Sequence, residues 1–357
     1  MHLPSSSPGV IEGFFGRPWS WEARRAYADF LQRNDYQYYL YAPKADRVLR
    51  EDWPDRWPEE TYGELQGLRE VYREAGVAWG VGLNLYELHC HCDEDAIRKL
   101  EAKIRYINGL QPDILAILFD DMRGDADEIA QTQVDVTHRA CALSTASSVI
   151  MCPTYYSDSP VLDRIFGERP AGYLESLGKS LDPTVHIFWT GAEVCSDAYP
   201  VEHLQSVGER LGRKPFIWDN YPVNDSEAMC RHLHLRAFEN RPNEMANWIA
   251  GHAVNPMNQA YLSQIPLMTL NRSYGERGSY NPVVAFEEAA RELCGGEFAS
   301  CLADDLFLFQ DCGLDQMDPA LKDRLVSKYE PFQTPFSREV VGWLRGEYPY
   351  ALDCLTE

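Results

Sequence analysis

Two neighbouring carboxylates, Asp120 and Asp121, directly follow an apolar run at residues 114–119. Carboxylates at the end of a buried segment are costly unless they are used or hydrogen-bonded. One of them could simply cap a following helix, but the pair together favours catalysis. Most glycosidases place two carboxyl groups on opposite sides of the anomeric carbon, which adjacent residues cannot easily do. Adjacent acids can instead serve neighbouring atoms, one at the glycosidic oxygen and one at the substituent on C2.

This arrangement suits hydrolysis that is assisted by the substrate. A 2-acetamido oxygen of the sugar would attack C1 and form an oxazoline, while one Asp orients the amide and the other protonates the leaving group. Two close carboxylates also push their pKa values apart, so we expect one to be ionised and one protonated near neutral pH.

Other polar and aromatic residues follow further predicted strands. Amides and carboxylates bind sugar hydroxyls, and aromatic faces pack on pyranose rings. The sequence therefore predicts a sugar site at these strand ends, with candidates Gly13, Lys44, Tyr155 or Tyr156, Trp218, Asn220 and Asn255.

The elements that would position these residues alternate between short apolar runs and longer amphipathic stretches, which is typical of βα units. We predict strands at residues 9–13, 36–42, 77–83, 113–119, 149–151, 184–189, 214–218 and 249–254. We predict helices at 21–32, 59–74, 94–107, 128–143, 173–180, 201–211, 226–235 and 258–270. Eight of each indicate an α/β fold, a (β/α)8 TIM barrel, in preference to a doubly wound open sheet.

The composition changes after the barrel. Residues beyond 280 form helical segments separated by glycine and proline. We therefore expect two parts, a catalytic barrel at residues 1–274 and a small helical appendage at 275–357.

The charge balance limits the partners. With 33 Lys and Arg against 55 Asp and Glu, the net charge is −22, which disfavours nucleic acid and anionic membranes. The first residues lack the pattern of a signal peptide and no apolar run is long enough to span a membrane, so we expect a cytoplasmic protein. No phosphate-binding glycine motif is present, and we expect no cofactor. Nothing in the sequence supports an oligomer, although one is possible.

One cluster could bind a metal ion. The cluster consists of His89, Cys90, His91, Cys92 and Asp93. Alternate side chains of an extended segment lie on one face, where they could bind zinc together. No second ligand pair lies nearby, so we interpret the cluster as a loop that leads into a helix. A metal-dependent barrel hydrolase using His89 and His91 remains an alternative.

The motifs together resemble glycoside hydrolase family 84, the O-GlcNAcases and related β-N-acetylglucosaminidases. The resemblance covers about residues 9–270. Its motifs are GVIEGFFGRPW at residues 9–19, YLYAPK at 39–44, LFDD at 118–121 and WDN at 218–220.

The resemblance implies roles for individual residues. Asp120 would assist the acetamido group and Asp121 would be the general acid/base. Trp218 would form part of the acetamido pocket and Tyr156 would lie near the acetamido and leaving groups. The residues that would contact sugar hydroxyls are Gly13, Lys44, Asn220, Asp225 and Asn255.

We therefore expect a retaining exo-β-N-acetylglucosaminidase that acts on a GlcNAc-bearing glycoside or glycoprotein. A catalytically silent GlcNAc-binding protein on the same barrel is the alternative. The aglycone, whether protein serine or threonine, another sugar or a cell-wall fragment, and the preference for GlcNAc over GalNAc stay open.

Overall fold

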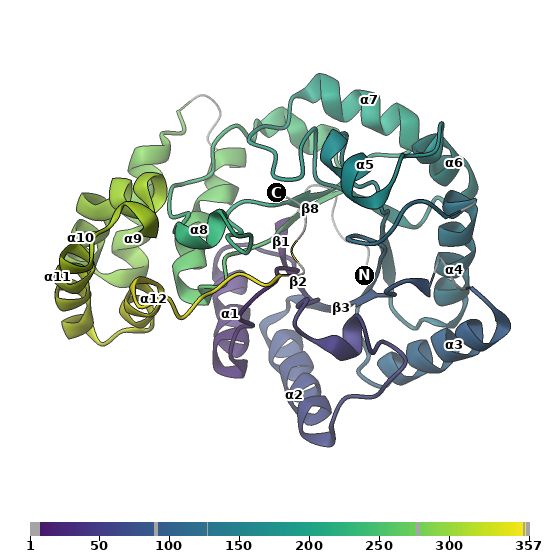
Figure 1. Cartoon of the computed structure of the whole chain (residues 1–357), viewed down its shortest axis with the longest axis horizontal. Coiled ribbons are helices and arrows are strands. Elements are labelled where there is room, and N and C mark those ends of the chain that lie inside the picture. The colour runs from purple at the N-terminus through teal and green to yellow at the C-terminus, as the bar shows by residue number, and fades with distance from the viewer. Residues whose placement is uncertain (1–7, 89–91, 127, 276–278, 353, 355–357) are drawn as a thin grey trace.

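The computed structural model describes residues 8–88, 92–126, 128–275, 279–352 and 354. Within these residues, eight parallel strands close into a barrel, in which each strand pairs with the next and β8 returns to β1. Figure 1 shows the surrounding helices and a separate helical group beside α8. The strands are β1 (Pro8–Glu12), β2 (Tyr38–Tyr41), β3 (Ala78–Asn84), β4 (Ile114–Leu118), β5 (Ser148–Cys152), β6 (His186–Trp189), β7 (Phe216–Asp219) and β8 (Gly251–Val254). The predicted (β/α)8 barrel is confirmed.

Helices alternate with the strands along the chain. They are α1 (Trp21–Arg33), α2 (Glu59–Ala75), α3 (Glu94–Asn108), α4 (Ile129–Leu143), α5 (Pro160–Phe166), α6 (Tyr173–Ser180), α7 (Val201–Leu211) and α8 (Ala260–Gly275). The described part contains no helix with the length and apolar character needed to cross a membrane.

Helix α3 illustrates how the sequence specifies this layer. Asp93 caps its first turn by accepting a hydrogen bond of 2.8 Å from the amide of Ala96. Leu100, Ile104 and Ile107 then form the buried stripe that faces the barrel.

A buried ion pair fastens α1 to the barrel. Glu12, at the end of β1, accepts hydrogen bonds of 2.9 and 2.6 Å from the guanidinium of Arg24, and a further one from the hydroxyl of Tyr39. The carboxylate is fully buried, so these partners compensate for the loss of water. Glu12 therefore holds the fold together at the strand end rather than facing the site.

The parallel register brings the strand ends to one level. Asn84 pairs with Leu118, Leu118 with Cys152, and Asp219 with Val254. Residues that directly follow the strands therefore emerge at the same end of the barrel, where barrel enzymes place their active sites.

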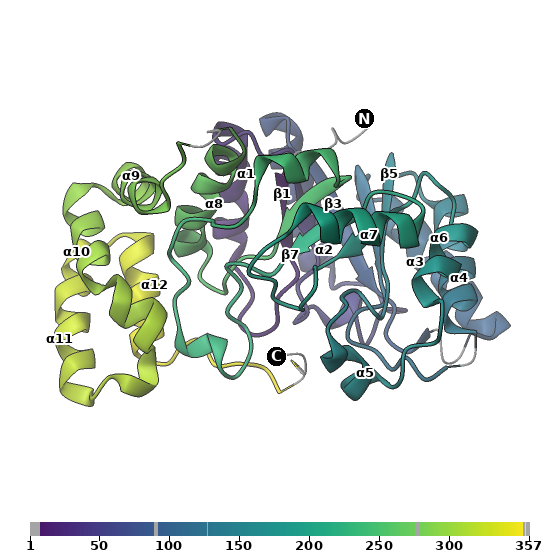
Figure 2. The same ribbon diagram turned by 90° about the horizontal axis from the view of Figure 1, so that it is seen from above.

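The remaining helices form a group outside the barrel: α9 (Pro282–Cys294), α10 (Gly296–Phe307), α11 (Pro319–Tyr329) and α12 (Pro335–Leu344), with a π-helical turn η5 (Leu308–Cys312) after α10. Figure 2 shows this group stacked to one side of the barrel. Its apolar core also includes Leu233, Leu235 and Ile265 of the barrel part, so the two parts share a hydrophobic cluster. A boundary at residues 274 and 275 stays a prediction.

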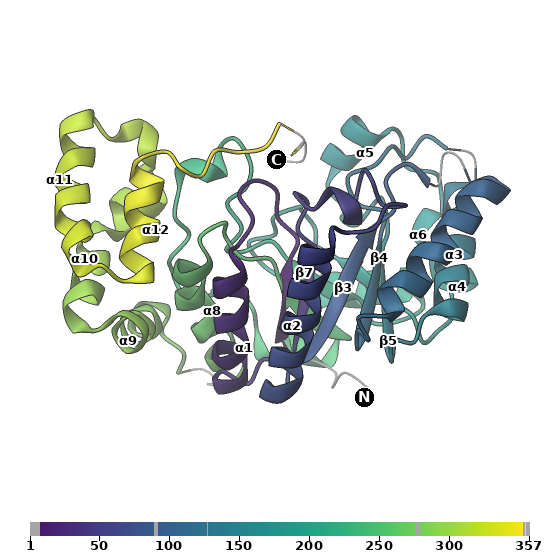
Figure 3. The ribbon, with the colours of Figure 1, turned by 90° about the horizontal axis from the view of Figure 1, so that it is seen from below.

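The polypeptide after α12 turns back toward the barrel, as the yellow segment in Figure 3 shows. Arg17 ties this segment down through an ion pair of 3.3 Å with Glu347, and its guanidinium lies 4.9 Å from the ring centre of Tyr348. The appendage therefore contacts the barrel at its site end as well as along α8.

One local prediction was wrong, and one short helix was missed. Residues 226–235 do not form a helix but an extended loop with one 3-10 turn, η3 (Met229–Arg231), because backbone groups of this stretch bond to the appended helices. The short helix α5 was not predicted, since seven residues give too little periodicity.

Candidate active site

One pocket at the strand ends is lined by all of the site residues expected from the sequence. About 520 Å³ of space, part of it open to solvent, lies between its lining residues. The expected residues in its lining are Gly13, Lys44, Asp120, Asp121, Tyr156, Trp218, Asn220, Asp225 and Asn255.

Asp120 is held by a buried lysine and an amide. Lys44 donates a short hydrogen bond to Oδ2 of Asp120, and both side chains are more than 90% buried. Asn84, the last residue of β3, donates from Nδ2 to the backbone oxygen of Asp120 at 3.1 Å and to its Oδ1 at 3.3 Å. Although burial acts to lower the pKa of Lys44, the charges of Asp120 and Asp121 outweigh it and raise this pKa. The buried ammonium of Lys44 is therefore paired with the carboxylate of Asp120.

Asp121 has different surroundings. Its Oδ1 accepts a hydrogen bond of 3.0 Å from Tyr156, and its Oδ2 lies 3.7 Å from Nζ of Lys44. Burial raises the pKa of Asp121, Lys44 opposes this, and the negative charge of Asp120 adds to it. The backbone of Asp121 has a φ of 57°, a left-handed conformation that is uncommon outside glycine and is often found at functional sites. This conformation turns the second carboxylate away from the path of the strand.

The two tyrosines after β5 face opposite ways. Tyr156 reaches Asp121, whereas Tyr155 donates its hydroxyl to the backbone oxygen of Gly167 at 2.7 Å and packs edge-on against Tyr173. The structure therefore brings Tyr156 to the acids and places Tyr155 in the packing between barrel and helices.

An indole and three polar groups form the opposite wall. Trp218 donates from Nε1 to Oδ1 of Asn220 at 2.9 Å, and Asn255 donates to the same oxygen at 3.0 Å. Asn255 accepts from the backbone amide of Gly13 at 3.2 Å. A Cβ atom on Gly13 would lie 2.5 Å from the Trp218 ring, so this position requires glycine. The wall is thus fixed by contacts between β1, β7 and β8.

The carboxylate of Asp225 also lines the pocket, but it is bonded to a backbone amide. Its Oδ2 accepts a hydrogen bond of 2.7 Å from the backbone amide of Phe15, which joins the loop after β7 to the loop after β1. Burial raises the pKa of Asp225 to about 6, against the opposing effect of the Phe15 amide. This group therefore changes its charge close to neutral pH.

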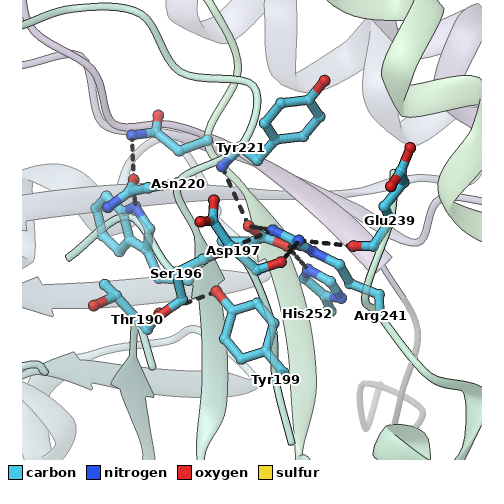
Figure 4. Close-up of polar contacts among 12 residues, drawn as sticks. Thr190, Ser196, Asp197, Tyr199, Asn220, Tyr221, Glu239, Arg241 and His252 are labelled. Carbon is cyan, nitrogen blue, oxygen red and sulfur yellow. Dashed lines mark hydrogen bonds and ion pairs between the residues drawn. The ribbon is translucent and has the colours of Figure 1, made fainter. Parts of the chain in front are cut away.

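A buried ionic network supports the end of β7 from behind. Asp219 lies between Trp218 and Asn220 and accepts two hydrogen bonds, of 2.9 and 2.7 Å, from the guanidinium of Arg241. His252 of β8 contacts the same carboxylate at 3.0 Å. Burial acts to raise the pKa of Asp219, but Arg241 and His252 outweigh it and lower this pKa. Figure 4 shows the side chains of Arg241 and His252 lying next to each other.

Some pocket residues were not predicted. Asn84 does not line the pocket but bonds to Asp120. It was not predicted either, although a polar residue that ends a buried strand was a usable signal. Cys152 is likewise the last residue of β5, and Thr190 directly follows β6. Met229 and Cys354 arrive from a long loop and from the C-terminal segment, and no local pattern marks them. The unpredicted lining residues are Phe15, Cys152, Thr190, Val194, Cys195, Val223, Ser226, Met229 and Cys354.

The possible metal cluster is only partly described. His89, Cys90 and His91 lie outside the described residues, so the metal alternative is not tested by geometry. Of the remainder, Cys92 is exposed and Asp93 caps α3. Across the described residues, no group of three or more His, Cys, Asp or Glu side chains is arranged to hold a metal ion.

The barrel and its pair of unequal acids define a site of the glycoside hydrolase type. The comparison with protein families then gives a specific assignment. The model of the beta-N-acetylglucosaminidase family matches residues 8–310, and the chain belongs to this family.

Individual relatives agree with this assignment. The chain is 29% identical over 279 residues to a protein O-GlcNAcase of Mus musculus and to one of Rattus norvegicus. Each match covers 74% of this chain but only 30% of the relative, so the chain corresponds to less than a third of these relatives. A solved mutant O-GlcNAc hydrolase of Thermobaculum terrenum superposes with a TM-score of 0.76 at 29% identity, covering 96% of this chain and 75% of the other.

Proposed function

We propose that the protein is a retaining exo-β-N-acetylglucosaminidase that releases terminal β-linked GlcNAc by substrate-assisted catalysis. The observation that carries the proposal is the unequal setting of two adjacent acids. Asp120 is ion-paired with Lys44, while the pKa of Asp121 is raised by burial. The ion pair suits Asp120 to stabilise a positive charge, and the raised pKa suits Asp121 to donate a proton.

In the first step the acetamido oxygen attacks C1 and the bond from C1 to the leaving oxygen breaks. Asp120 accepts a hydrogen bond from the acetamido N–H and stabilises the positive charge that develops there. Asp121 gives its proton to the leaving oxygen, so that the aglycone departs as an alcohol.

In the second step Asp121, now a carboxylate, takes a proton from water. The water oxygen attacks C1 of the oxazoline, and the bond between C1 and the acetamido oxygen breaks. Two successive inversions at C1 return the β-anomer. Tyr156 holds Asp121 in place for both proton transfers through its 3.0 Å hydrogen bond.

The rest of the pocket would recognise the sugar. Trp218 would pack against the acetamido methyl group, and Gly13 leaves the space that the indole needs. Lys44 and the backbone of Gly13 would contact hydroxyls together with the polar side chains of Asn220, Asp225 and Asn255.

The two mammalian relatives are named protein O-GlcNAcase, which supports GlcNAc on serine or threonine of a glycoprotein as the substrate. The net charge of −22 supports the expectation that nucleic acid and anionic membranes are not partners. A cytoplasmic location and the absence of a cofactor stay predictions.

The proposal is tested by measuring aryl release from matched β-glycosides of GlcNAc, GalNAc and glucose, with the anomer of the first product followed by NMR. We expect turnover of the GlcNAc glycoside with β-anomer as first product, and little turnover of the glucoside. Equal rates on GlcNAc and glucose, or an α-anomer as first product, would contradict the mechanism. Binding of GlcNAc without turnover would favour the silent sugar-binding protein instead.

A further inference from the structure

The loop between β7 and β8 lines part of the pocket but contains little regular secondary structure. Its residues Val223, Asp225, Ser226 and Met229 line the pocket. Within residues 220–236 only η3 is regular, and this turn spans three residues. Hydrogen bonds within the loop, and bonds to groups outside it, together fix its shape.

The appended helices supply these groups from the π-helical turn η5. Gln310 is the main contact, because its Oε1 accepts hydrogen bonds from the backbone amides of Leu235 at 2.9 Å and Arg236 at 2.8 Å. The backbone oxygen of Phe309 accepts a third bond of 3.0 Å from the amide of Leu233. A π-helical turn widens the backbone locally, and such turns are frequent at functional sites.

The backbone of Gln310 is also connected to the residue that precedes the pocket carboxylate. The backbone oxygen of Gln310 contacts Nδ1 of His232 at 3.0 Å. The backbone oxygen of His232 in turn accepts a hydrogen bond of 2.9 Å from Nδ2 of Asn224, the residue before Asp225. Gly313 permits this approach, because a Cβ there would lie 2.6 Å from the His232 ring and its φ is +71°.

Ion pairs between the loop and the appendage are less important. Arg231 pairs with Asp315 at 2.6 Å, and Arg236 bonds to Asp311 at 3.0 Å. All four side chains are at least 37% exposed, so water screens these pairs. The hydrogen bonds of Gln310 to backbone amides are therefore the stronger constraint on the loop.

We propose that Gln310 is a positioning residue for substrate binding, which holds the β7–β8 loop so that Asp225 faces the sugar. The helical appendage would thus complete the active site rather than only extend the barrel. This inference rests on the proposed function, in which Asp225 binds a sugar hydroxyl.

The test is a double-mutant cycle on an aryl GlcNAc glycoside. We expect Gln310→Ala to raise KM about tenfold with a much smaller change in kcat, since the acids Asp120 and Asp121 stay in place. Gln310→Glu keeps an acceptor for the two amides and should stay close to the wild-type KM. In the Asp225→Asn background, Gln310→Ala should add little, because the group that it positions has already been disabled.

Gln316→Ala is the matched control, since it removes an exposed glutamine from the same appendage. Should Gln310→Ala fail to fold, Gln310→Asn shortens the side chain by one methylene and is measured in its place. The inference would be overturned if Gln310→Ala left KM unchanged. It would also be overturned if Gln310→Ala raised KM by the same factor in the Asp225→Asn background as in the wild type. A wild-type enzyme without turnover would instead contradict the proposed function, and the same cycle would then be measured on the dissociation constant of GlcNAc.

Discussion

The hydroxyl of Tyr156 donates a hydrogen bond of 3.0 Å to Oδ1 of Asp121. This contact joins the end of β5 to the end of β4 and orients the second acid of the pair. Oδ2 of Asp121 lies 3.7 Å from Nζ of Lys44, and in the proposed mechanism this oxygen would pass a proton to the leaving group. The role of each acid can be separated by substitution.

Asp121→Asn should affect substrates according to their leaving groups. An activated aryl alcohol departs with little protonation, whereas a serine hydroxyl needs the acid. We therefore expect kcat/KM to fall by about 10²–10⁴-fold only for substrates with a poor leaving group. Steady-state kcat/KM on a series of aryl GlcNAc glycosides of rising phenol pKa measures this.

Asp120→Asn is the comparison variant, and it should reduce kcat on every member of the series because it acts on the acetamido group. If both variants lost the same factor on all substrates, the assignment of the two roles would be wrong.

Asp225 should make stability depend on pH. Its pKa is raised from 3.8 to about 6, so the folded state binds more protons than the unfolded state between these values. The free energy of unfolding should therefore decrease as the pH rises through this interval, with roughly 3 kcal/mol as the upper limit of the contribution. Denaturant unfolding of wild type and Asp225→Asn at several pH values measures it. The variant should lack this decline, and a difference between the two proteins that does not change with pH would contradict the account.

Arg241 should be important for stability rather than for chemistry. Its guanidinium and Asp219 are each less than 5% exposed, so Arg241→Met leaves a buried carboxylate without its main partner. We expect a loss of about 3–5 kcal/mol in the free energy of unfolding.

Arg73→Met is the matched control, because it removes an arginine from an exposed pair with Glu70. Urea unfolding of both variants should show a large change only for Arg241→Met. Equal changes would mean that the network behind Trp218 does not support the fold.

Strand ends were the part of the site that the sequence could predict. Each strand is a short apolar run, and the parallel register then forces the residues that follow it, such as Lys44 and Asp120, to one end of the barrel. Tyr156 lines the pocket and Tyr155 bonds to Gly167, because alternate residues after a strand face opposite sides.

Long-range contacts could not be predicted in the same way. The stretch at 226–235 has a helical composition, yet amides of Leu233 and Leu235 bond to residues 309 and 310, far along the chain. Cys354 of the C-terminal segment also lines the pocket, far along the chain from the strands that form it. Such contacts depend on how distant elements pack, which neither periodicity nor local spacing records.

The nucleophilic role of the acetamido group is tested most directly by replacing its methyl hydrogens with fluorine, one at a time, in an aryl GlcNAc glycoside. Fluorine withdraws electrons from the carbonyl oxygen and makes it a weaker nucleophile without a large change in size. We predict that kcat/KM falls steeply and steadily from the acetyl to the trifluoroacetyl substrate. Rates that stay level across the series would contradict participation of the substrate's own carbonyl oxygen.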